Sequence, residues 1–508
     1  MGKPNLSTSK KLAMLITYGQ IFTQTLCTFF LTKFYIAQLG EEAYGLYQMI
    51  YAVAQYILIL DLGISTTMIR YITDFDTRDN HKQAENFAFH MLVLIGGLLV
   101  VIAGVGVVVN YNLGNIYPSC TAEEIELAHK VFSTMLVQIC LTILCRYAQG
   151  ISMAYDRYSY VKGVAIGQIL IGAVLSVIFV LGDMGIQGIV RANTIVIFFN
   201  FLAVMIYDIA VLHFKPKFHS LDMRMIAPAV VLMFAMMLQS IVGYVNSSVD
   251  KTILGIMATK RDVTIYSVAA TIITMFNALP TAVSSVFQPE AVRLVARGAG
   301  PDEIEDFVVK PGRFQFIITG GFIAGFALFG RDFITCWTGE STVIAWAYVL
   351  IILVPNLLPL IQNTMLAILN AKNRRLFRSL VLFGITGLNI GLTIVLIPFV
   401  GSIGAPIATG ISYIIGHCVI MNIYYHKTLK LNIGRMFKKI CKGILPCVLI
   451  TSVVCLPIML WKIEASWMTL VTKAAIFCVI YAGLLYKFGL SQNEKSMITS
   501  RISKLSKR

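Results

Sequence analysis

The sequence contains few charged residues. Asp, Glu, Lys and Arg make up 13% of its 508 residues, whereas hydrophobic residues make up 57%. A soluble domain carries about 25% charged residues and cannot bury so much apolar surface in one core. Because apolar segments run from one end of the chain to the other, the sequence predicts a polytopic membrane protein whose solvent is lipid.

The motifs of soluble enzymes and of metal sites are also lacking. The sequence contains no Walker A, GxSxG or HExxH motif, and its ten cysteines form no CxxC or Cys/His pattern. The predicted external segments are too short to hold a catalytic domain. We therefore expect no enzymatic activity, no metal or other cofactor and no nucleic-acid partner, while coupling to H⁺ or Na⁺ stays open.

About fourteen apolar stretches are long enough to cross a bilayer, which takes roughly 20 mainly apolar residues in a helix. The predicted spans are 12–38, 43–70, 87–110, 125–150, 163–182, 186–212, 226–257, 263–292, 313–330, 343–370, 379–400, 403–426, 442–461 and 466–487. Most of the 41 Lys and Arg residues fall in every second loop and in the two terminal segments. By the positive-inside rule, this pattern predicts cytoplasmic termini and an even number of spans.

An internal repeat relates the first six spans to the next six. At a shift of 219 residues, Tyr47 coincides with Tyr266, Ser65 with Ser284, Ala148 with Ala367 and Gly185 with Gly404. Six spans per half preserve orientation, so the repeat would be parallel. We predict an all-α fold of two six-helix lobes, 1–212 and 213–426, followed by helices 13 and 14 and a basic cytoplasmic tail in 427–508.

Several short motifs point together to one family. They are Leu39-Gly40 and Tyr44-Gly45-Leu46-Tyr47 after span 1, Leu60-Asp61-Leu62-Gly63 with Arg70 in span 2, Asp250-Lys251 with Leu254-Gly255 in span 7, residues 367–375 at the end of span 10, and residues 401–410 at the start of span 12. Over essentially the whole chain, the sequence resembles the Wzx-like (O-antigen, capsule or teichoic-type) polysaccharide flippases. These form a branch of the multidrug/oligosaccharidyl-lipid/polysaccharide exporter (MOP) superfamily.

The resemblance implies a transporter that works by alternating access between two lobes. Its substrate would be a lipid-linked oligosaccharide, typically on undecaprenyl diphosphate, moved from the inner to the outer leaflet of a bacterial plasma membrane for cell-surface polysaccharide biosynthesis. Membrane lipids are further partners, and other polysaccharide-assembly proteins stay open as partners. An exporter of drugs or organic cations is the alternative on the same fold, and a membrane-embedded polysaccharide enzyme would need a larger external loop.

Four of the cations in or at the predicted spans are substrate-binding candidates, because a charge there is costly and therefore suggests function. Lys33 and Lys251 occupy nearly equivalent repeat positions near the outer ends of spans 1 and 7. Arg70 and Arg146 lie toward the inner ends of spans 2 and 4. Facing a cavity, these side chains would bind a diphosphate head group. Alternatively, they snorkel to the interface and anchor their helices.

Two acids and several polar stripes complete the predicted site. Asp61 forms a structural ion pair if a cation lies beside it, and otherwise it is a proton-coupling group; Asp250 is the second ion-coupling candidate. Polar residues recur along single faces of spans 1, 7 and 10, and the substrate-binding candidates among them are Gln20, Gln24, Asn246 and Asn363. Such stripes either line a cavity or hold helices together.

Overall fold

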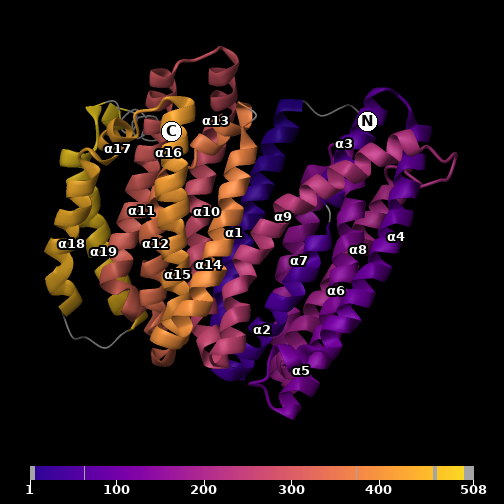
Figure 1. The fold of residues 1–508 in the computed structure, drawn as a ribbon, viewed down its shortest axis with the longest axis horizontal. Helices are drawn as coiled ribbons and strands as arrows, with labels where there is room; N and C mark the ends of the chain where they lie inside the picture. Colours follow the sequence, from indigo (N-terminus) through magenta and orange to yellow (C-terminus); the bar gives the residue numbers. More distant parts are fainter. Residues whose placement is uncertain (1–5, 62, 373, 461–465, 493, 497–508) are drawn as a thin grey trace. The chain divides into compact units, whose positions relative to one another are not determined.

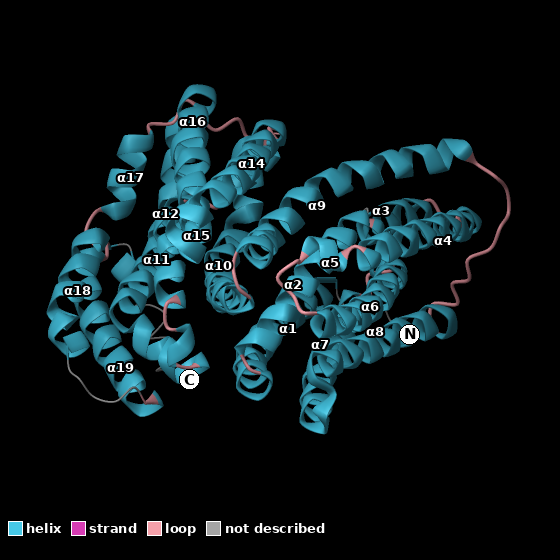
Figure 2. Ribbon diagram, turned by 60° about the horizontal axis from the view of Figure 1, so that its bottom comes forward, coloured by secondary structure: helices cyan, strands magenta, loops and turns pink. Residues whose placement is uncertain are grey.

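The computed structural model describes residues 6–61, 63–372, 374–460, 466–492 and 494–496. These residues form helices joined by loops, and no strand occurs among them (Figure 2). Packing contacts divide the chain into two units, Met1–Thr264 and Ile265–Arg508. The predicted lobes, 1–212 and 213–426, follow the sequence repeat instead of contacts, and they stay a prediction.

Unit 1 is a helical bundle arranged around α6. Its helices are α1 (Leu6–Leu39), α2 (Glu41–Ile57), α3 (Ile64–Thr77), α4 (His81–Tyr111), α5 (Leu113–Ile116), α6 (Ala122–Ala154), α7 (Tyr158–Phe179), α8 (Gly185–Ala210), α9 (Met223–Met257) and the start of α10 (Lys260–Ala296), with short turns η1 (Leu58–Asp61) and η2 (Val180–Met184). α6 packs on α2, α3, α4 and α8, while α1 packs on α7 (Figure 1). Helix α6, which carries Arg146, therefore contacts α3, which carries Arg70.

The start of α6 is fixed by its sequence. The Thr121 hydroxyl accepts the backbone N–H of Glu124 at 3.3 Å, and the Glu124 carboxylate accepts the N–H of Thr121 at 2.8 Å. This capping box satisfies two amide groups that have no partner inside the helix. The same carboxylate also forms an ion pair with Lys260 at the start of α10, which joins these two helix ends.

Unit 2 is arranged around α11 (Pro301–Thr338). Its other helices are α12 (Ala345–Ile361), α13 (Met365–Ala371), α14 (Arg375–Val400), α15 (Gly404–Tyr413), α16 (Asn422–Leu429), α17 (Ile433–Cys441), α18 (Ile444–Leu460) and α19 (Trp467–Leu484), with short turns η3 (Glu340–Thr342), η4 (Gly401–Ile403), η5 (Ile414–Met421) and η6 (Leu485–Gly489). α11 packs on α12, α17, α18 and α19. The two helices beyond the predicted repeat, α18 and α19, are thus attached to unit 2 through α11.

Nine helices among the described residues are long and apolar enough to cross a membrane, or eleven if each of two bent pairs is one span. Two of the nine, Tyr158–Ala210 and Phe377–Leu429, are 53 residues long. A straight helix of that length would measure about 80 Å, against a hydrocarbon core of about 30 Å. Since their halves pack on each other, each is two spans. With α1, which is long enough but carries polar residues, the structure accommodates the fourteen predicted spans.

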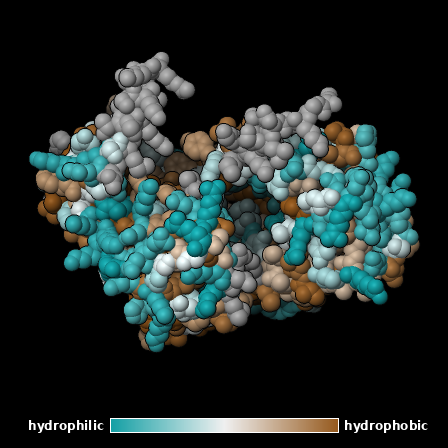
Figure 3. All heavy atoms as spheres, turned by 90° about the horizontal axis from the view of Figure 1, so that it is seen from above, coloured by the Kyte–Doolittle hydropathy of each residue, from teal (hydrophilic) through white to brown (hydrophobic). Residues whose placement is uncertain are grey.

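Hydrophilic residues gather on the face that Figure 3 shows, which is the upper end of the helices in Figure 1. In unit 1, this end brings the segment 212–222 against the start of α4: the Lys217 N–H donates to the Glu85 carbonyl, and Asn86 donates to the carbonyl of Ser220 at 2.8 Å. Several basic side chains belong to this end and are exposed, namely Arg78, Lys82, Arg157, Lys215 and Lys217. The distribution agrees with the loops that the positive-inside rule assigns to one side of the membrane.

Candidate functional site

The second predicted span, 43–70, is broken in the middle. α2 ends at Ile57, η1 follows, and Gly63 adopts a left-handed conformation with φ of 62° before α3 begins. A Cβ atom on Gly63 would lie 2.5 Å from the Cβ of Met236 on α9, so both the backbone angle and the close approach require glycine. A break inside the membrane leaves backbone groups without helical partners, and it is tolerated where protein or a water-filled cavity surrounds it.

An ion pair lies at this break. Asp61 is the last residue of η1, and its carboxylate forms an ion pair with the Arg146 guanidinium of α6. Asp61 is buried, with 4% of its surface exposed, whereas the side chain of Arg146 remains 36% exposed. The side chain of Arg146 also lies near the hydroxyl of Tyr244 on α9. Of the two readings of Asp61, the ion pair is therefore the one that the structure contains.

A second polar contact joins α9 to α2 closer to the other end of unit 1. The Lys251 ammonium donates to the side-chain carbonyl of Gln48 at 3.0 Å, and the Gln48 amide donates to the Tyr44 hydroxyl at 2.8 Å. About two turns farther along α2 than Gln48, the hydroxyl of Tyr56 lies 3.0 Å from that of Thr252 on α9. Because Gln48 is neutral, its bond to Lys251 leaves the positive charge of the half-buried ammonium group uncancelled.

Tyrosine rings lie beside these polar contacts along α2. The Tyr47 and Tyr51 rings are stacked with centroids 6.0 Å apart, and Tyr44 lies 6.1 Å from Tyr47. The Tyr35 ring of α1 lies 6.4 Å from that of Tyr44. Of these residues Tyr35 and Tyr44 are buried, and a buried tyrosine combines an apolar ring with a hydroxyl that usually has a hydrogen-bond partner.

The other predicted residues are distributed along both units. Lys33 and Arg70 are exposed on α1 and α3, and Asn246 is exposed on α9, whereas Asp250 is buried. In α1, Gln20 is half-buried and Gln24 donates to Thr28 at 3.2 Å; in unit 2, Asn363 is half-buried. Arg70 lines a depression of about 550 Å³ together with Asp74, Arg78 and other residues of α3. The predicted pairing of Lys33 with Lys251 across a two-fold axis stays a prediction.

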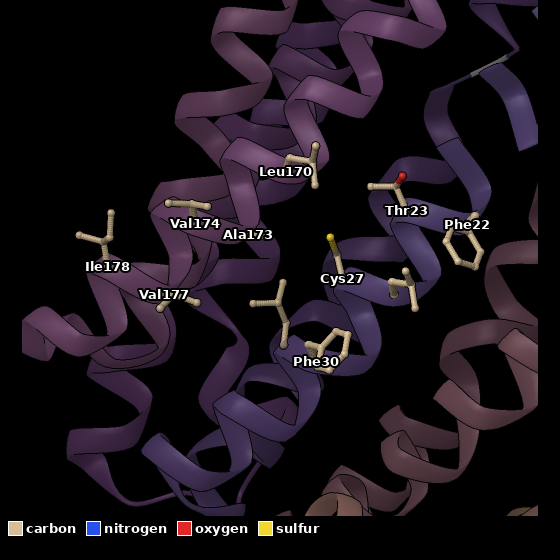
Figure 4. Close-up of a pocket in the computed structure, with 11 residues that line it drawn as sticks. Phe22, Thr23, Cys27, Phe30, Leu170, Ala173, Val174, Val177 and Ile178 are labelled. Carbon is tan, nitrogen blue, oxygen red and sulfur yellow. The ribbon is translucent and has the colours of Figure 1, made fainter. Parts of the chain in front are cut away.

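An apolar groove of about 500 Å³ runs between α1 and α7 (Figure 4). Its walls are aliphatic and aromatic side chains, and only Thr23 and Cys27 add a polar atom to them. Cys27 points from α1 toward α7.

No group of three His, Cys, Asp or Glu side chains in the described part of the chain is placed to hold a metal ion.

Comparison with known protein families identifies the family of this chain. The model of a family described as "Polysaccharide biosynthesis protein" matches residues 10–292, which is more than half of the chain. The chain belongs to this family. No curated protein matches the sequence. The family membership agrees with the resemblance drawn from the short motifs.

Solved transporter structures share the fold of this polysaccharide biosynthesis family member. The lipid II flippase MurJ, in an inward closed conformation, superimposes with a TM-score of 0.72 at 14% identity and covers 94% of this chain and 99% of its own. An inward-facing multidrug resistance MATE family transporter of the MOP superfamily gives a TM-score of 0.67 at 14% identity, over 80% of this chain and 95% of its own. A point mutant of the Vibrio cholerae MATE transporter VcmN gives 0.57 at 16% identity, over 84% and 98%. Such identities establish the fold alone, and they confirm the predicted all-α MOP-type membrane fold.

The polar partners on α2 of this family member are not among the residues predicted from the sequence. Tyr44, Gln48, Tyr51 and Gln55 recur at spacings of four, three and four residues, which places them on one helix face. The same spacing drew attention to the polar stripe of span 1. Applied to span 2, it would have identified Gln48 as a candidate beside the predicted cations.

Proposed function

We propose that this protein moves a lipid-linked oligosaccharide, carried on undecaprenyl diphosphate, from the inner to the outer leaflet of a bacterial plasma membrane by alternating access. Membership in the polysaccharide biosynthesis family supports the substrate class, and the fold that it shares with transporters supports transport without an enzymatic step. Both termini are cytoplasmic in this proposal, and the lipid-linked glycan is the main partner.

The single observation that carries the proposal is the setting of Lys251. This cation lies in a membrane-spanning helix, is partly accessible, and has a neutral amide, Gln48, as its hydrogen-bond partner. A charge in that position is costly and is retained where it serves a ligand of opposite sign. A diphosphate head group offers that charge and several acceptor oxygens for charge-assisted hydrogen bonds.

The ion pair at the break of span 2 has a different role in this proposal. Asp61 cancels most of the charge of Arg146, so this pair holds η1 and α6 together and leaves the exposed part of the guanidinium as a secondary contact for the head group. Asp250 remains the ion-coupling candidate, and it is buried next to Lys251 in sequence. Arg70, Lys33 and the amides of the polar stripes are secondary substrate contacts.

The test is a reconstituted flipping assay with a fluorescent undecaprenyl-diphosphate glycolipid and a membrane-impermeant quencher. We expect the wild type to equilibrate the lipid between leaflets and Lys251→Gln to slow this by about tenfold, the loss of one charge-assisted hydrogen bond. Lys130→Gln, on an exposed lysine that pairs with Glu126, is the matched control and keeps the wild-type rate. A wild type that flips nothing under these conditions contradicts the proposal.

A second function, export of organic cations, is separated by changing the charge next to Lys251. Gln48→Glu would place a carboxylate within 3.0 Å of the ammonium group and cancel its charge. Flipping of the anionic glycolipid then falls by about tenfold, whereas uptake of an organic cation into the same vesicles would stay equal or rise. A variant that flips the glycolipid at the wild-type rate argues against Lys251 as a head-group ligand.

A further inference from the structure

The groove between α1 and α7 lies on the part of these helices that leads to one end of unit 1. It is lined by Phe22, Leu26 and Phe30 from α1, which recur every four residues, and by Leu170, Val174 and Ile178 from α7, which do the same (Figure 4). Residues four apart lie near one face of a helix, so each helix contributes one wall of an elongated groove. The groove therefore has the form of a slot for one extended chain.

A buried hydrogen bond joins α1 to α7 beside this slot. The Tyr35 hydroxyl of α1 donates to the Ser176 hydroxyl of α7 at 2.8 Å, and both side chains are buried. Beyond this bond α1 ends at Leu39 and α7 at Phe179. In the predicted topology these are the outer ends of spans 1 and 5, so the groove runs from about the middle of the bilayer toward its outer face.

A cation lies on the same face of α1 as the groove. Lys33 follows Phe30 by three residues, Leu26 by seven and Phe22 by eleven, so its side chain leaves the helix above the same ladder. The distance along the axis from Phe30 to Lys33 is about 4.5 Å. Lys33 is exposed. The slot is thus apolar along its length and positively charged at its outer end.

We propose that this groove and Lys33 bind the single isoprenoid chain and the phosphate of the lipid carrier on the outer-leaflet side. This inference rests on the proposed flippase function and names a separate subsite for the carrier. A phospholipid has two chains and fits a single slot poorly, whereas a polyprenyl phosphate has one chain and an anionic head at its end. Within lipid there is no hydrophobic gain from moving a chain into the groove, so packing and the charge of Lys33 provide the selectivity.

The experiment uses the full chain in phosphatidylcholine nanodiscs and an undecaprenyl phosphate that carries a diazirine on its isoprenoid chain. After irradiation, mass spectrometry identifies the labelled peptides. We expect label on residues 22–31 and 170–178. Unlabelled undecaprenyl phosphate competes for this label, uncharged undecaprenol competes about tenfold less well, and phosphatidylglycerol, an anion with two chains, does not. Equal competition by phosphatidylglycerol would show ordinary boundary lipid and overturn the proposal.

Two variants and one control locate the binding to the groove. Val174→Trp fills the slot and removes the label, and Lys33→Gln abolishes the advantage of the phosphate over the alcohol. Val100→Trp, at an exposed apolar position of α4, keeps the wild-type pattern. Persistent groove labelling in a folded Val174→Trp protein contradicts the proposal; the competition order in the wild type tests it without any variant.

Failure of this inference and failure of the proposed function give different results. The labelling measures binding and requires no transport. If the protein flips glycolipid but the label is spread evenly over its lipid-facing surface, the groove proposal fails and the flippase proposal stands. If the label appears in the groove but no glycolipid is flipped, the polyprenyl phosphate site stands and the flippase proposal fails.

Discussion

Asp61 is a carboxylate inside a membrane-spanning segment, and its second oxygen has no hydrogen-bond partner among the described residues. Its stability there depends on the guanidinium of Arg146. Burying one member of an ion pair without the other is far more costly than burying neither charge. The two charges therefore stabilise each other, and removing either one leaves the other as a destabilising unpaired charge.

This dependence predicts a strong coupling between two substitutions. Asp61→Asn leaves Arg146 without its counter-charge, and we expect the free energy of unfolding to fall by about 2 kcal/mol, less than for a fully buried cation because Arg146 is partly exposed. Asp61→Asn combined with Arg146→Gln recovers part of that loss. Thermal unfolding in detergent measures both. Losses that simply add up would mean that the two residues are not coupled.

At the scale of elements, close helix approach depends on particular glycines. Gly45 of α2 faces the start of α10, where an added Cβ would lie 2.0 Å from the Lys260 carbonyl oxygen. The same seam contains the Arg261–Glu41 ion pair at 2.9 Å and a bond from the Thr264 hydroxyl to the Glu41 carbonyl at 2.6 Å. The added Cβ would overlap with backbone atoms, and rotation of a side chain cannot relieve such an overlap.

We accordingly predict opposite results for two alanine substitutions. Gly45→Ala pushes α2 from α10 and lowers the unfolding temperature by several degrees, since overpacking costs about 1–3 kcal/mol. Gly96→Ala, on α4 with no atom within 4 Å of the added Cβ, keeps or slightly raises that temperature. Differential scanning fluorimetry of the two variants in one detergent makes the comparison, and similar unfolding temperatures would contradict the close approach.

Hydropathy predicted the elements well because each span must bury a long apolar run in lipid. It gave span 2 as one segment, however, since the break at η1 and Gly63 changes the backbone without interrupting the apolar run. α17 falls where no span is predicted: it has only nine residues, and its basic residues alternate with the buried Met436 and Ile440.

The site was predicted less completely than the fold. Arg146, Asp61 and Lys251 stood out because a charge in an apolar run is rare. Their partners did not, because Gln48 and Tyr244 are ordinary polar residues until tertiary packing brings α2, α6 and α9 together. Which cation is compensated and which is not follows only from those contacts.

At the scale of the whole chain, Arg313 joins α11 to the segments that come before α18 and after α19. Arg313 of α11 donates to the Glu494 carboxylate at 2.8 Å, to the carbonyls of Lys439 and Lys442 at 3.0 and 2.9 Å, and to that of Gly489 at 2.8 Å. Lysine cannot match this planar set of donors. We call Arg313 and these acceptors the C-terminal clasp.

The C-terminal clasp predicts a pH-dependent stability. Burial would raise the pKa of Glu494, but hydrogen bonds from Arg313 and Ser491 outweigh it and hold this pKa below its usual range. Its stabilisation is therefore complete above the unfolded pKa of about 4.3 and is lost as the pH falls through the lower folded value. We expect Glu494→Gln to lower the unfolding temperature at pH 7 and to flatten its decline below pH 5. An unchanged pH profile would contradict the clasp.

Orientation in the membrane is the remaining property of the whole molecule, and unit 1 allows a direct test. Glu123 lies in the first turn of α6, at the end where Glu124 pairs with Lys260, and Lys215 belongs to the segment that packs on α4 at the opposite end. Both side chains are exposed. In a variant without the native cysteines, we expect Glu123→Cys to react with a membrane-impermeant maleimide in intact cells, and Lys215→Cys to react only after permeabilisation. The reverse pattern would place the basic end outside, against the positive-inside rule. It would also move the α1–α7 groove into the inner leaflet, where the same binding would serve uptake of the carrier instead of its release.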